Sequence, residues 1–365
     1  MSSAANAAEP TARTTRTLRV ESAAAARAPM RISLAGGGTD VPPLARGIGG
    51  RVVCAAIDLH VRAIVEPFDR GWVRLEGSWG TVDAPHADAP HEEGAAPSLR
   101  AESITRRADE APSTDVAFRL LEAVRAAAHV EDGVRIRVES DLTPGTGLGG
   151  SAAAAVALLA AFERALGRGV QPMRLAHEAS HLERNVLGLK CGLQDQVCAA
   201  AGGVLDLRFF DDGFRIEPID APPSLIRDLH AGLLLVDTRV RRVSGEVLDV
   251  TNDGCCCDLT ADLVAAADDT ARGFRLGSVP LVVAGMRRSA SAKLRRGGSS
   301  ALPWEWVRRL SRLGAAVIRA CGAGGGGHVL LWAEPSAHAD LIRAVEPCIV
   351  RRPSLGAPGV TTTAG

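Results

Sequence analysis

The sequence predicts a two-domain protein of the α+β class, and three observations lead to this prediction. A chain of 365 residues is long enough for two domains that each have a core. Strand patterns and helix patterns both occur along it, the most distinct being a strand, a glycine loop and a long helix at residues 135–166. A Pro-rich link at 218–223 separates two further strand patterns. We therefore expect an N-terminal domain at 28–220, a C-terminal domain at 221–350, and tails at 1–27 and 351–365.

Composition and charge narrow the class of partner. Hydrophobic residues make up 46% of the chain and charged residues 23%, as in soluble globular proteins. The formal net charge is zero, and only 3% of residues are aromatic, which argues against nucleic acid or an anionic membrane as partner. No apolar run reaches the roughly 18 residues that a membrane span needs. We expect a cytoplasmic protein that binds a small molecule, and its oligomeric state stays open.

Eight cysteines occur without a metal-binding pattern. None forms a C-x-x-C pair, and no histidine lies near them at zinc spacing. Reduced thiols of a cytoplasmic protein are the expectation, with a role for the triplet Cys255 to Cys257 left open. The first 27 residues lack the apolar core of a signal peptide and are expected to be disordered.

The first strand pattern, at residues 30–35, runs into three glycines and the polar pair Thr39 and Asp40. A second strand pattern follows at 52–65. A hairpin connection with Asp40 as a turn residue would explain this segment. We favour a binding site, because a bare glycine turn lets a carboxylate and backbone groups approach a hydroxylated ligand closely.

Residues 83–115 are polar and rich in Pro and Ala, which predicts a surface insertion or a lid. The apolar spacing at 116–128 predicts an amphipathic helix.

The glycine loop at residues 144–150 lies between a predicted strand at 135–140 and a helix that begins near Ser151. This layout favours a phosphate site, because the first N–H groups of a helix lack intrahelical partners and glycines let an anion reach them. A tight connection is the alternative. No Gly-Lys-Ser/Thr ends the loop, so a Walker P-loop is excluded. A dinucleotide fold conflicts with 172–188, which read as a helix where a second strand is needed.

The second half of the chain alternates between strand and helix patterns. Strands are expected at 204–210 and 231–238, and helices over 258–320. Three arginines at 239–242 would grip a substrate phosphate or form an exposed charged turn. A third glycine cluster at 321–327 precedes a strand, and the last 30 residues are expected to be a frayed tail.

Three stretches in this order resemble the motifs of the GHMP small-molecule kinases: PMRISLAGGGTDVPP, PGTGLGGSA and CGAGGGGHVLLWAEP. The resemblance extends from about residue 28 to residue 335 and is strongest to the D-glycero-D-manno-heptose 7-phosphate kinase branch. Two departures stand out. Gly150 replaces a serine of the second motif, and residues 282–294 lack the Trp and Lys pattern of that branch.

The resemblance implies a fold and an activity. The fold would combine a ribosomal protein S5 domain 2-like N-terminal domain with a ferredoxin-like C-terminal domain. The activity would be an ATP-dependent, Mg²⁺-dependent kinase that phosphorylates the anomeric hydroxyl of a heptose 7-phosphate-like sugar to a sugar 1-phosphate. A kinase for another sugar or cyclitol, of the fucose or galactose type, and a noncatalytic sugar-binding homologue remain alternatives.

The resemblance also implies roles for individual residues. Asp195, in the stretch KCGLQDQVCAAAGG, would be the catalytic base, and Arg31 would stabilise it and the transferred phosphoryl group. Ser151 and Glu183 would bind Mg²⁺. ATP would contact Pro144, Gly145, Thr146, Gly147, Leu148, Gly149, Gly150, Ser151 and Ala152. The sugar would contact Gly38, Thr39, Asp40, Gly192, Arg242, Gly324 and Gly325.

Overall fold

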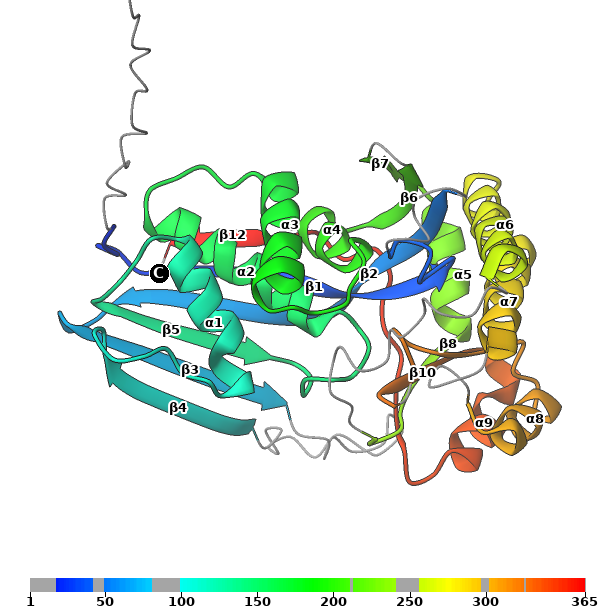
Figure 1. Cartoon of the computed structure of the whole chain (residues 1–365). Coiled ribbons are helices and arrows are strands. Elements are labelled where there is room, and N and C mark those ends of the chain that lie inside the picture. Colours follow the sequence, from blue (N-terminus) through cyan, green and yellow to red (C-terminus); the bar gives the residue numbers. More distant parts are fainter. Residues whose placement is uncertain are drawn as a thin grey trace, which may run out of the picture.

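The computed structural model describes residues 18–41, 49–80, 99–210, 213–240, 256–296, 302–324 and 326–364. Within them, an eight-stranded sheet and a four-stranded sheet lie next to each other, each with helices packed on it (Figure 1). No helix in these ranges is long and apolar enough to cross a membrane.

The eight-stranded sheet is built around the long strand β2. Residues Gly50–Ala55 of β2 pair with β6, and residues Val61–Pro67 pair with β5, so the sheet divides along this strand. The main order is β12-β1-β2-β5-β3-β4, and all pairs are antiparallel except β3 with β5. The strands are β1 (Ala24–Ala35), β2 (Gly50–Pro67), β3 (Trp72–Gly80), β4 (Leu99–Arg107), β5 (Val134–Ser140), β6 (Val204–Phe210), β7 (Gly213–Pro218) and β12 (Thr361–Ala364).

Four helices cover one face of this sheet (Figure 1). They are α1 (Val116–Ala127), α2 (Gly150–Ala165), α3 (Pro172–His181) and α4 (Gln194–Ala201), and one turn of π-helix (Leu182–Val186) continues α3. Helix α2 packs on β1 and β2 and buries 12 of its 16 residues. Its alanines allow this close approach, because they combine the best helix propensity with the smallest side chain.

The four-stranded sheet has the order β11-β8-β10-β9 and is antiparallel throughout. In chain order its units are a strand, helices, two strands, a helix and a strand, which is the ferredoxin-like arrangement. Its elements are α5 (Pro223–Gly232), β8 (Leu233–Asp237), α6 (Cys256–Arg275), α7 (Val279–Arg296), α8 (Trp304–Arg312), β9 (Val317–Ala320), β10 (His328–Trp332), the short 3-10 helix Pro335–Ala337, α9 (His338–Ala344) and β11 (Ile349–Arg351).

The two sheets share a hydrophobic core. Along β8, Leu233 and Leu235 face a core that includes α2, α6 and the large sheet, whereas Leu234 and Val236 face α8 and α9. Successive side chains of a strand point to opposite faces, so this alternation places one face of the small sheet against the N-terminal region.

Several predicted elements are confirmed. The strand at 52–65 lies within β2, the helix at 116–128 is α1, and the helix after the glycine loop begins at Gly150. The strand at 204–210 matches β6.

The predicted C-terminal tail is wrong. Beyond β10 lie α9, β11 and β12, and β12 returns to the large sheet, where Thr361–Ala364 pair with Ala24–Arg27 of β1. The same pairing places the start of β1 inside the predicted N-terminal tail. Residues 99–107 of the predicted insertion form β4, residues 317–320 of the predicted helical region form β9, and 81–98 lie outside the described residues.

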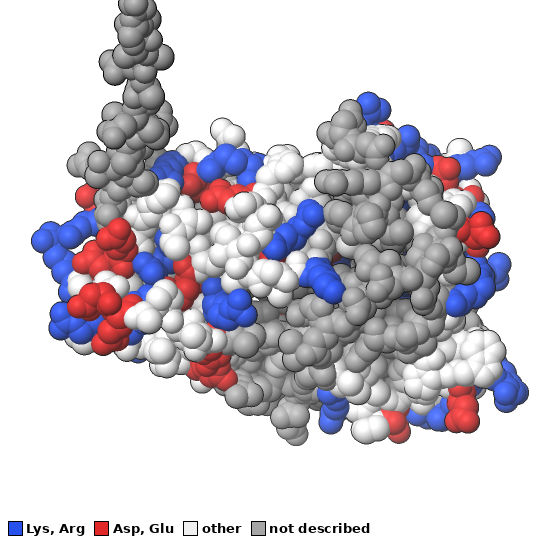
Figure 2. Space-filling view, viewed as in Figure 1, with Lys and Arg blue, Asp and Glu red and all other residues white. Residues whose placement is uncertain are grey.

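Charges of both signs are interspersed on the face shown in Figure 2, wherever that face is described. This distribution agrees with the formal net charge of zero. It offers no broad basic surface there for a polyanion.

Candidate active site

Asp195 and Arg31 form a bidentate ion pair. Arg31 lies on β1, and its Nε and Nη2 donate to the two carboxylate oxygens of Asp195, at 2.6 and 2.5 Å. Its Nη1 donates to the carbonyl of Gly147 at 2.8 Å, so the same guanidinium contacts the glycine loop. Burial alone would lower the pKa of Arg31, but the Asp195 carboxylate outweighs it, and the pKa is raised. A planar fork of this kind fixes the orientation of the carboxylate.

Asp195 lies beside the first residue of helix α2. Gly149 caps this helix with φ 76°, in the left-handed region. A Cβ at this position would lie 3.5 Å from Asp195 Oδ2 and 3.3 Å from Arg31 Cγ. Backbone N–H groups at a helix start attract anions, so an anion bound there would lie next to the Asp195 carboxylate.

The glycine loop contributes backbone rather than side chains. Gly145 and Gly147 both have φ 81°, which explains two of its glycines. The side chains of Thr146 and Leu148 are buried, at 3% and 0% exposure. Of the residues expected to contact ATP, these two therefore offer only main-chain groups.

Ser151 and Glu183 lie in contact. Ser151 Oγ donates to Glu183 Oε1 at 2.5 Å, and Gln196 Nε2 donates to Glu183 Oε2 at 2.5 Å. Burial raises the pKa of Glu183, although both hydrogen bonds act in the opposite direction. A hydroxyl and a carboxylate are the oxygen donors that Mg²⁺ prefers, and Mg²⁺ usually completes its shell with substrate phosphates and water. The pair therefore fits a nucleotide-bound Mg²⁺, and the described residues contain no cluster of three or more His, Cys, Asp or Glu suited to a metal.

Asp40 occupies the turn after β1. Its carboxylate accepts hydrogen bonds from the N–H groups of Gly38 and Gln194, both at 3.2 Å. Burial, with the nearby Asp195 carboxylate, raises the pKa of Asp40. A Cβ at Gly192 would lie 1.7 Å from Asp40 Oδ2, so glycine is required at this position. The turn and the segment before α4 therefore bring two carboxylates to one site.

The side chain of Thr39 makes hydrogen bonds that hold the turn after β1 to β2. Its side chain is fully buried, and Oγ1 lies 2.9 Å from the carbonyl of Gly36 and 3.0 Å from that of Arg51. It also accepts the N–H of Arg51 at 3.0 Å. This burial leaves only main-chain groups of Thr39 for the predicted contact with the sugar.

The third glycine stretch contacts the second. The N–H of His328 donates to the carbonyl of Thr146 at 3.0 Å, and a Cβ at Gly327 would lie 2.4 Å from the same oxygen. Gly324 lies in this loop with φ 92°. Gly325 of the same loop lies outside the described residues, and so does Arg242, which was expected to contact the sugar.

Three polar residues near the site were not singled out by the sequence. Gln196 is buried and contacts Glu183, and it belongs to the quoted QDQ stretch, which was its only signal. Lys293 on α7 donates to the carbonyl of Gly322 at 3.0 Å. Arg319 on β9 donates to the carbonyl of Leu34 at 2.6 Å and to Ser33 Oγ at 3.0 Å.

Cys191 lies beside the site but is a poor nucleophile. Its Sγ is 3.7 Å from Gln196 Nε2, and burial together with Glu183 and Asp195 raises its pKa to about 12. The reactive form of cysteine is the thiolate, which this environment disfavours. The side chains of Cys255 to Cys257 lie outside the described residues, and the five cysteines that are described have free thiols.

Comparisons with known proteins bear on the family and the fold. The family described as GHMP kinases N terminal domain matches residues 115–203, and GHMP kinases C terminal matches residues 270–345. A curated D-glycero-alpha-D-manno-heptose 7-phosphate kinase from Campylobacter jejuni is 24% identical over 226 residues, which are 60% of this chain and 60% of that protein. A mevalonate kinase from Thermococcus sibiricus is 29% identical over 160 residues, 43% of this chain and 45% of that protein. The chain thus matches less than two thirds of either relative.

A solved structure matches over nearly the whole chain. The crystal structure of a D-glycero-D-manno-heptose 1-phosphate kinase from Bacteroides thetaiotaomicron superimposes with a TM-score of 0.71, at 20% identity, and the match covers 94% of this chain and 99% of that one. At this identity the likeness shows the fold. The chain therefore carries an N-terminal and a C-terminal GHMP kinase domain, matched in that order, and has the two-domain fold of a solved sugar-phosphate kinase.

Proposed function

We propose that this protein transfers the γ-phosphoryl group of ATP to the anomeric hydroxyl of a heptose 7-phosphate-like sugar. The observation that supports this most is the position of the Asp195 carboxylate, fixed by Arg31 and 3.5 Å from the Cβ position of Gly149 at the start of α2. A base beside a phosphate-binding helix end is the arrangement that phosphoryl transfer to an alcohol needs. Two of the similar proteins are, by their printed names, a heptose 7-phosphate kinase and a heptose 1-phosphate kinase, so both concern a phosphorylated heptose, and the first name supports an acceptor whose anomeric hydroxyl is free.

In the proposed reaction, the hydroxyl oxygen of the sugar forms a bond to the γ-phosphorus while the bond between that phosphorus and the bridging oxygen of ADP breaks. Asp195 accepts the proton of the hydroxyl. Arg31 keeps Asp195 aimed at the hydroxyl and places positive charge near the transferred group. Such transition states are loose, so positioning and electrostatic stabilisation supply most of the catalysis.

Ser151 and Glu183 would bind Mg²⁺, whose charge would neutralise the β- and γ-phosphates. The Glu183 carboxylate accepts hydrogen bonds from Ser151 and Gln196, and the nearby positive charge of Arg31 also favours its charged form. The turn at Gly38–Asp40 and Gly192 would contact the sugar, with Asp40 accepting hydrogen bonds from its hydroxyls.

The substitution Asp195→Asn tests this proposal. It should leave ATP affinity within about twofold and lower turnover by roughly 10² to 10⁴, the usual contribution of a general base. Wild type and variant would be incubated with ATP and a panel of sugars, with and without a phosphate group, and products would be read by phosphorus NMR. Asp340→Asn, which removes an exposed carboxylate on α9, is the control and should behave as wild type.

Near-normal turnover of Asp195→Asn would remove this residue from the mechanism. Binding of ATP and sugars without any product from the wild-type protein would support the noncatalytic alternative, which the glycine at position 150 brought into consideration. If the wild-type protein phosphorylates a sugar that carries no phosphate, that sugar would be the acceptor instead of the proposed heptose phosphate.

A further inference from the structure

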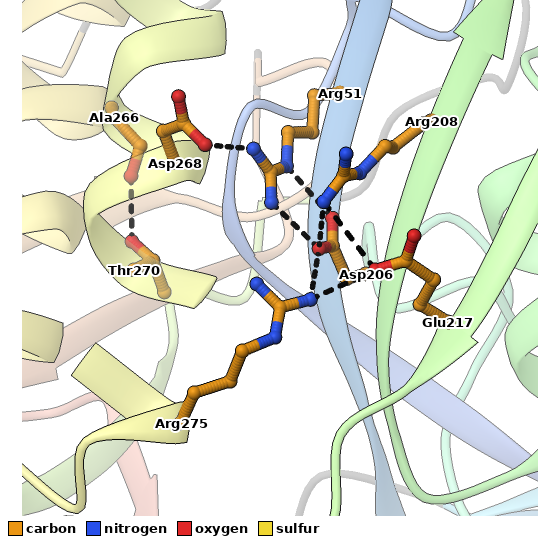
Figure 3. Close-up of polar contacts among 8 residues, drawn as sticks. All are labelled: Arg51, Asp206, Arg208, Glu217, Ala266, Asp268, Thr270 and Arg275. Carbon is orange, nitrogen blue, oxygen red and sulfur yellow. Dashed lines mark hydrogen bonds and ion pairs between the residues drawn. The ribbon is translucent and has the colours of Figure 1, made fainter. Parts of the chain in front are cut away.

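Six charged residues form a connected cluster where the large sheet meets helix α6 (Figure 3). Three are arginines and three are carboxylates, so the cluster has no formal net charge. We call it the Asp206 network, and its members are Arg51 on β2, Asp206 and Arg208 on β6, Glu217 on β7, and Asp268 and Arg275 on α6.

Asp206 is the centre of this network and is fully buried. Arg51 donates to its two oxygens from Nε and Nη2, at 2.8 and 2.7 Å, and Arg275 donates from Nη2 at 2.6 Å. Burial by itself would raise the pKa of Asp206, but the hydrogen bonds from Arg51 and Arg275 lower it. The carboxylate therefore stays charged, and the bidentate fork holds the Arg51 guanidinium in one orientation.

The network attaches α6 to the sheet at two points. Nη1 of Arg51 pairs with Asp268. Arg275, the last residue of the helix, pairs with Asp206 and also with Glu217, at 3.0 Å. The two points are seven positions apart in the helix, a distance of about 10 Å along its axis.

The backbone of Arg51 contacts the turn that carries Asp40. Its N–H donates to Thr39 Oγ1 at 3.0 Å, and its carbonyl lies 3.0 Å from the same hydroxyl. That carbonyl would lie only 1.9 Å from a Cβ at Gly36. One residue thus contacts α6 through its side chain and the turn at residues 36–40 through its main chain.

Helices α6 and α7 also contact this turn directly. A Cβ at Gly36 would lie 3.0 Å from the Cβ of Ala267, the neighbour of Asp268, and the N–H of Gly36 donates to Ser289 Oγ at 3.2 Å. A shift of α6 would therefore be transmitted to the turn by packing as well as through Arg51.

We propose that Arg51 is a positioning residue, which couples α6 to the turn at residues 36–40 and so sets where Asp40 lies relative to Asp195. The geometric basis is the hydrogen bond from the N–H of Gln194, the neighbour of Asp195, to Asp40 Oδ2. The proposal rests on the proposed function to the extent that this turn contacts the acceptor sugar. A purely structural network would stabilise the fold without any selective effect on the turn.

Asp268→Asn tests the coupling, because this side chain is 66% exposed and its loss should not prevent folding. Amide hydrogen exchange at residues 36–41 should become about threefold faster, as a weakened surface contact allows. The KM for the acceptor should rise by a similar factor, while kcat and the KM for ATP stay within about twofold. Arg51→Lys, which keeps the charge but loses the fork, should show the same pattern more strongly.

Asp262→Asn is the matched control. It removes the same charge from the same helix, but Asp262 pairs with Arg288 and Arg295 of α7, at 3.1 and 2.6 Å, and not with Arg51. It should leave both readouts unchanged. In addition, Thr39→Val combined with Asp268→Asn should give less than the sum of the two single effects on exchange, because both act on the turn through Arg51.

Faster exchange at 36–41 in Asp268→Asn and not in Asp262→Asn supports the coupling whether or not phosphoryl transfer is found, so failure of the proposed function would be seen separately. Equal exchange rates at residues 36–41 in both variants and in wild type would overturn the coupling. If the protein is active and both Asp268→Asn and Arg51→Lys leave the KM for the acceptor unchanged, the proposal that Arg51 positions Asp40 is overturned.

Discussion

Lys293 shows how the environment of one side chain affects stability. Its Nζ donates to the carbonyl of Gly322, and no carboxylate among the described residues pairs with it. Burial, with the nearby positive charge of Arg319, lowers its pKa well below the ordinary value of 10.5. The folded state therefore binds this proton less tightly than the unfolded state, and stability increases as pH rises toward 10.5.

Lys293→Met should consequently stabilise the protein at pH 7. We expect the midpoint of thermal unfolding to rise by on the order of 2 °C. This gain should shrink as the pH approaches the pKa of the lysine in the unfolded chain. Lys293→Arg, which retains a charge, should give no gain. Calorimetry between pH 7 and pH 10 measures both, and a gain that grows with pH would contradict the assignment.

Gly192→Ala tests the contact between Gly192 and Asp40. The new Cβ would lie 1.7 Å from Asp40 Oδ2, so the carboxylate must move. We expect the KM for the acceptor to rise by about tenfold or more, because small displacements of positioning groups are costly. Gly169→Ala is the control, since no atom lies within 4 Å of its Cβ position. Steady-state kinetics with equal KM values for both variants would exclude a role for Asp40 in acceptor binding.

The residues of the site differ in how far the sequence predicted them. Asp195, Arg31, Ser151 and Glu183 were placed by resemblance to known motifs, and the structure brings them together in two contacting pairs. Arg51 had no such signal, because its partner Asp206 lies 155 residues away in the chain. Pairings at that separation depend on the sheet register, which a pattern of residues does not reveal.

At the scale of elements, local pattern succeeded where the element is long and failed where it is short. The run of alanines and leucines in α2 has strong helix propensity and predicted the helix to within one residue. Helix α4 has only eight residues and follows a glycine segment, so no helix was predicted there. Strand β12 is a threonine-rich end whose structure comes from pairing with β1, a tertiary effect.

Strand β12 provides a prediction at this scale. Ending the chain at Val360 removes the four residue pairs between β12 and β1 and exposes the edge of β1. We expect thermal unfolding to shift down by about 4 °C. Alanine at positions 361–363 keeps the backbone pairing and should cost much less, because these side chains are mostly exposed. A shortened chain as stable as the full one would mean that β12 does not pair in solution.

For the whole molecule, composition predicted the class and the motifs predicted the fold, but neither predicted how closely the two sheets are joined. Phe274 of α6 is completely buried in the same core as β1, β2 and α2. The Asp206 network adds polar contacts across the same junction. The packed core continues across the predicted domain boundary near residue 220. The boundary therefore stays a prediction from the sequence.

The central claim is that the start of helix α2 binds a triphosphate whose terminal phosphate faces Asp195. A crystal structure with a nonhydrolysable ATP analogue and Mg²⁺ tests it most directly. We predict phosphate oxygens within hydrogen-bond distance of the N–H groups of residues 150–152, Mg²⁺ on Ser151 and Glu183, and the γ-phosphate opposite the Asp195 carboxylate. Phosphates bound away from the start of α2 and from Asp195 would contradict the account.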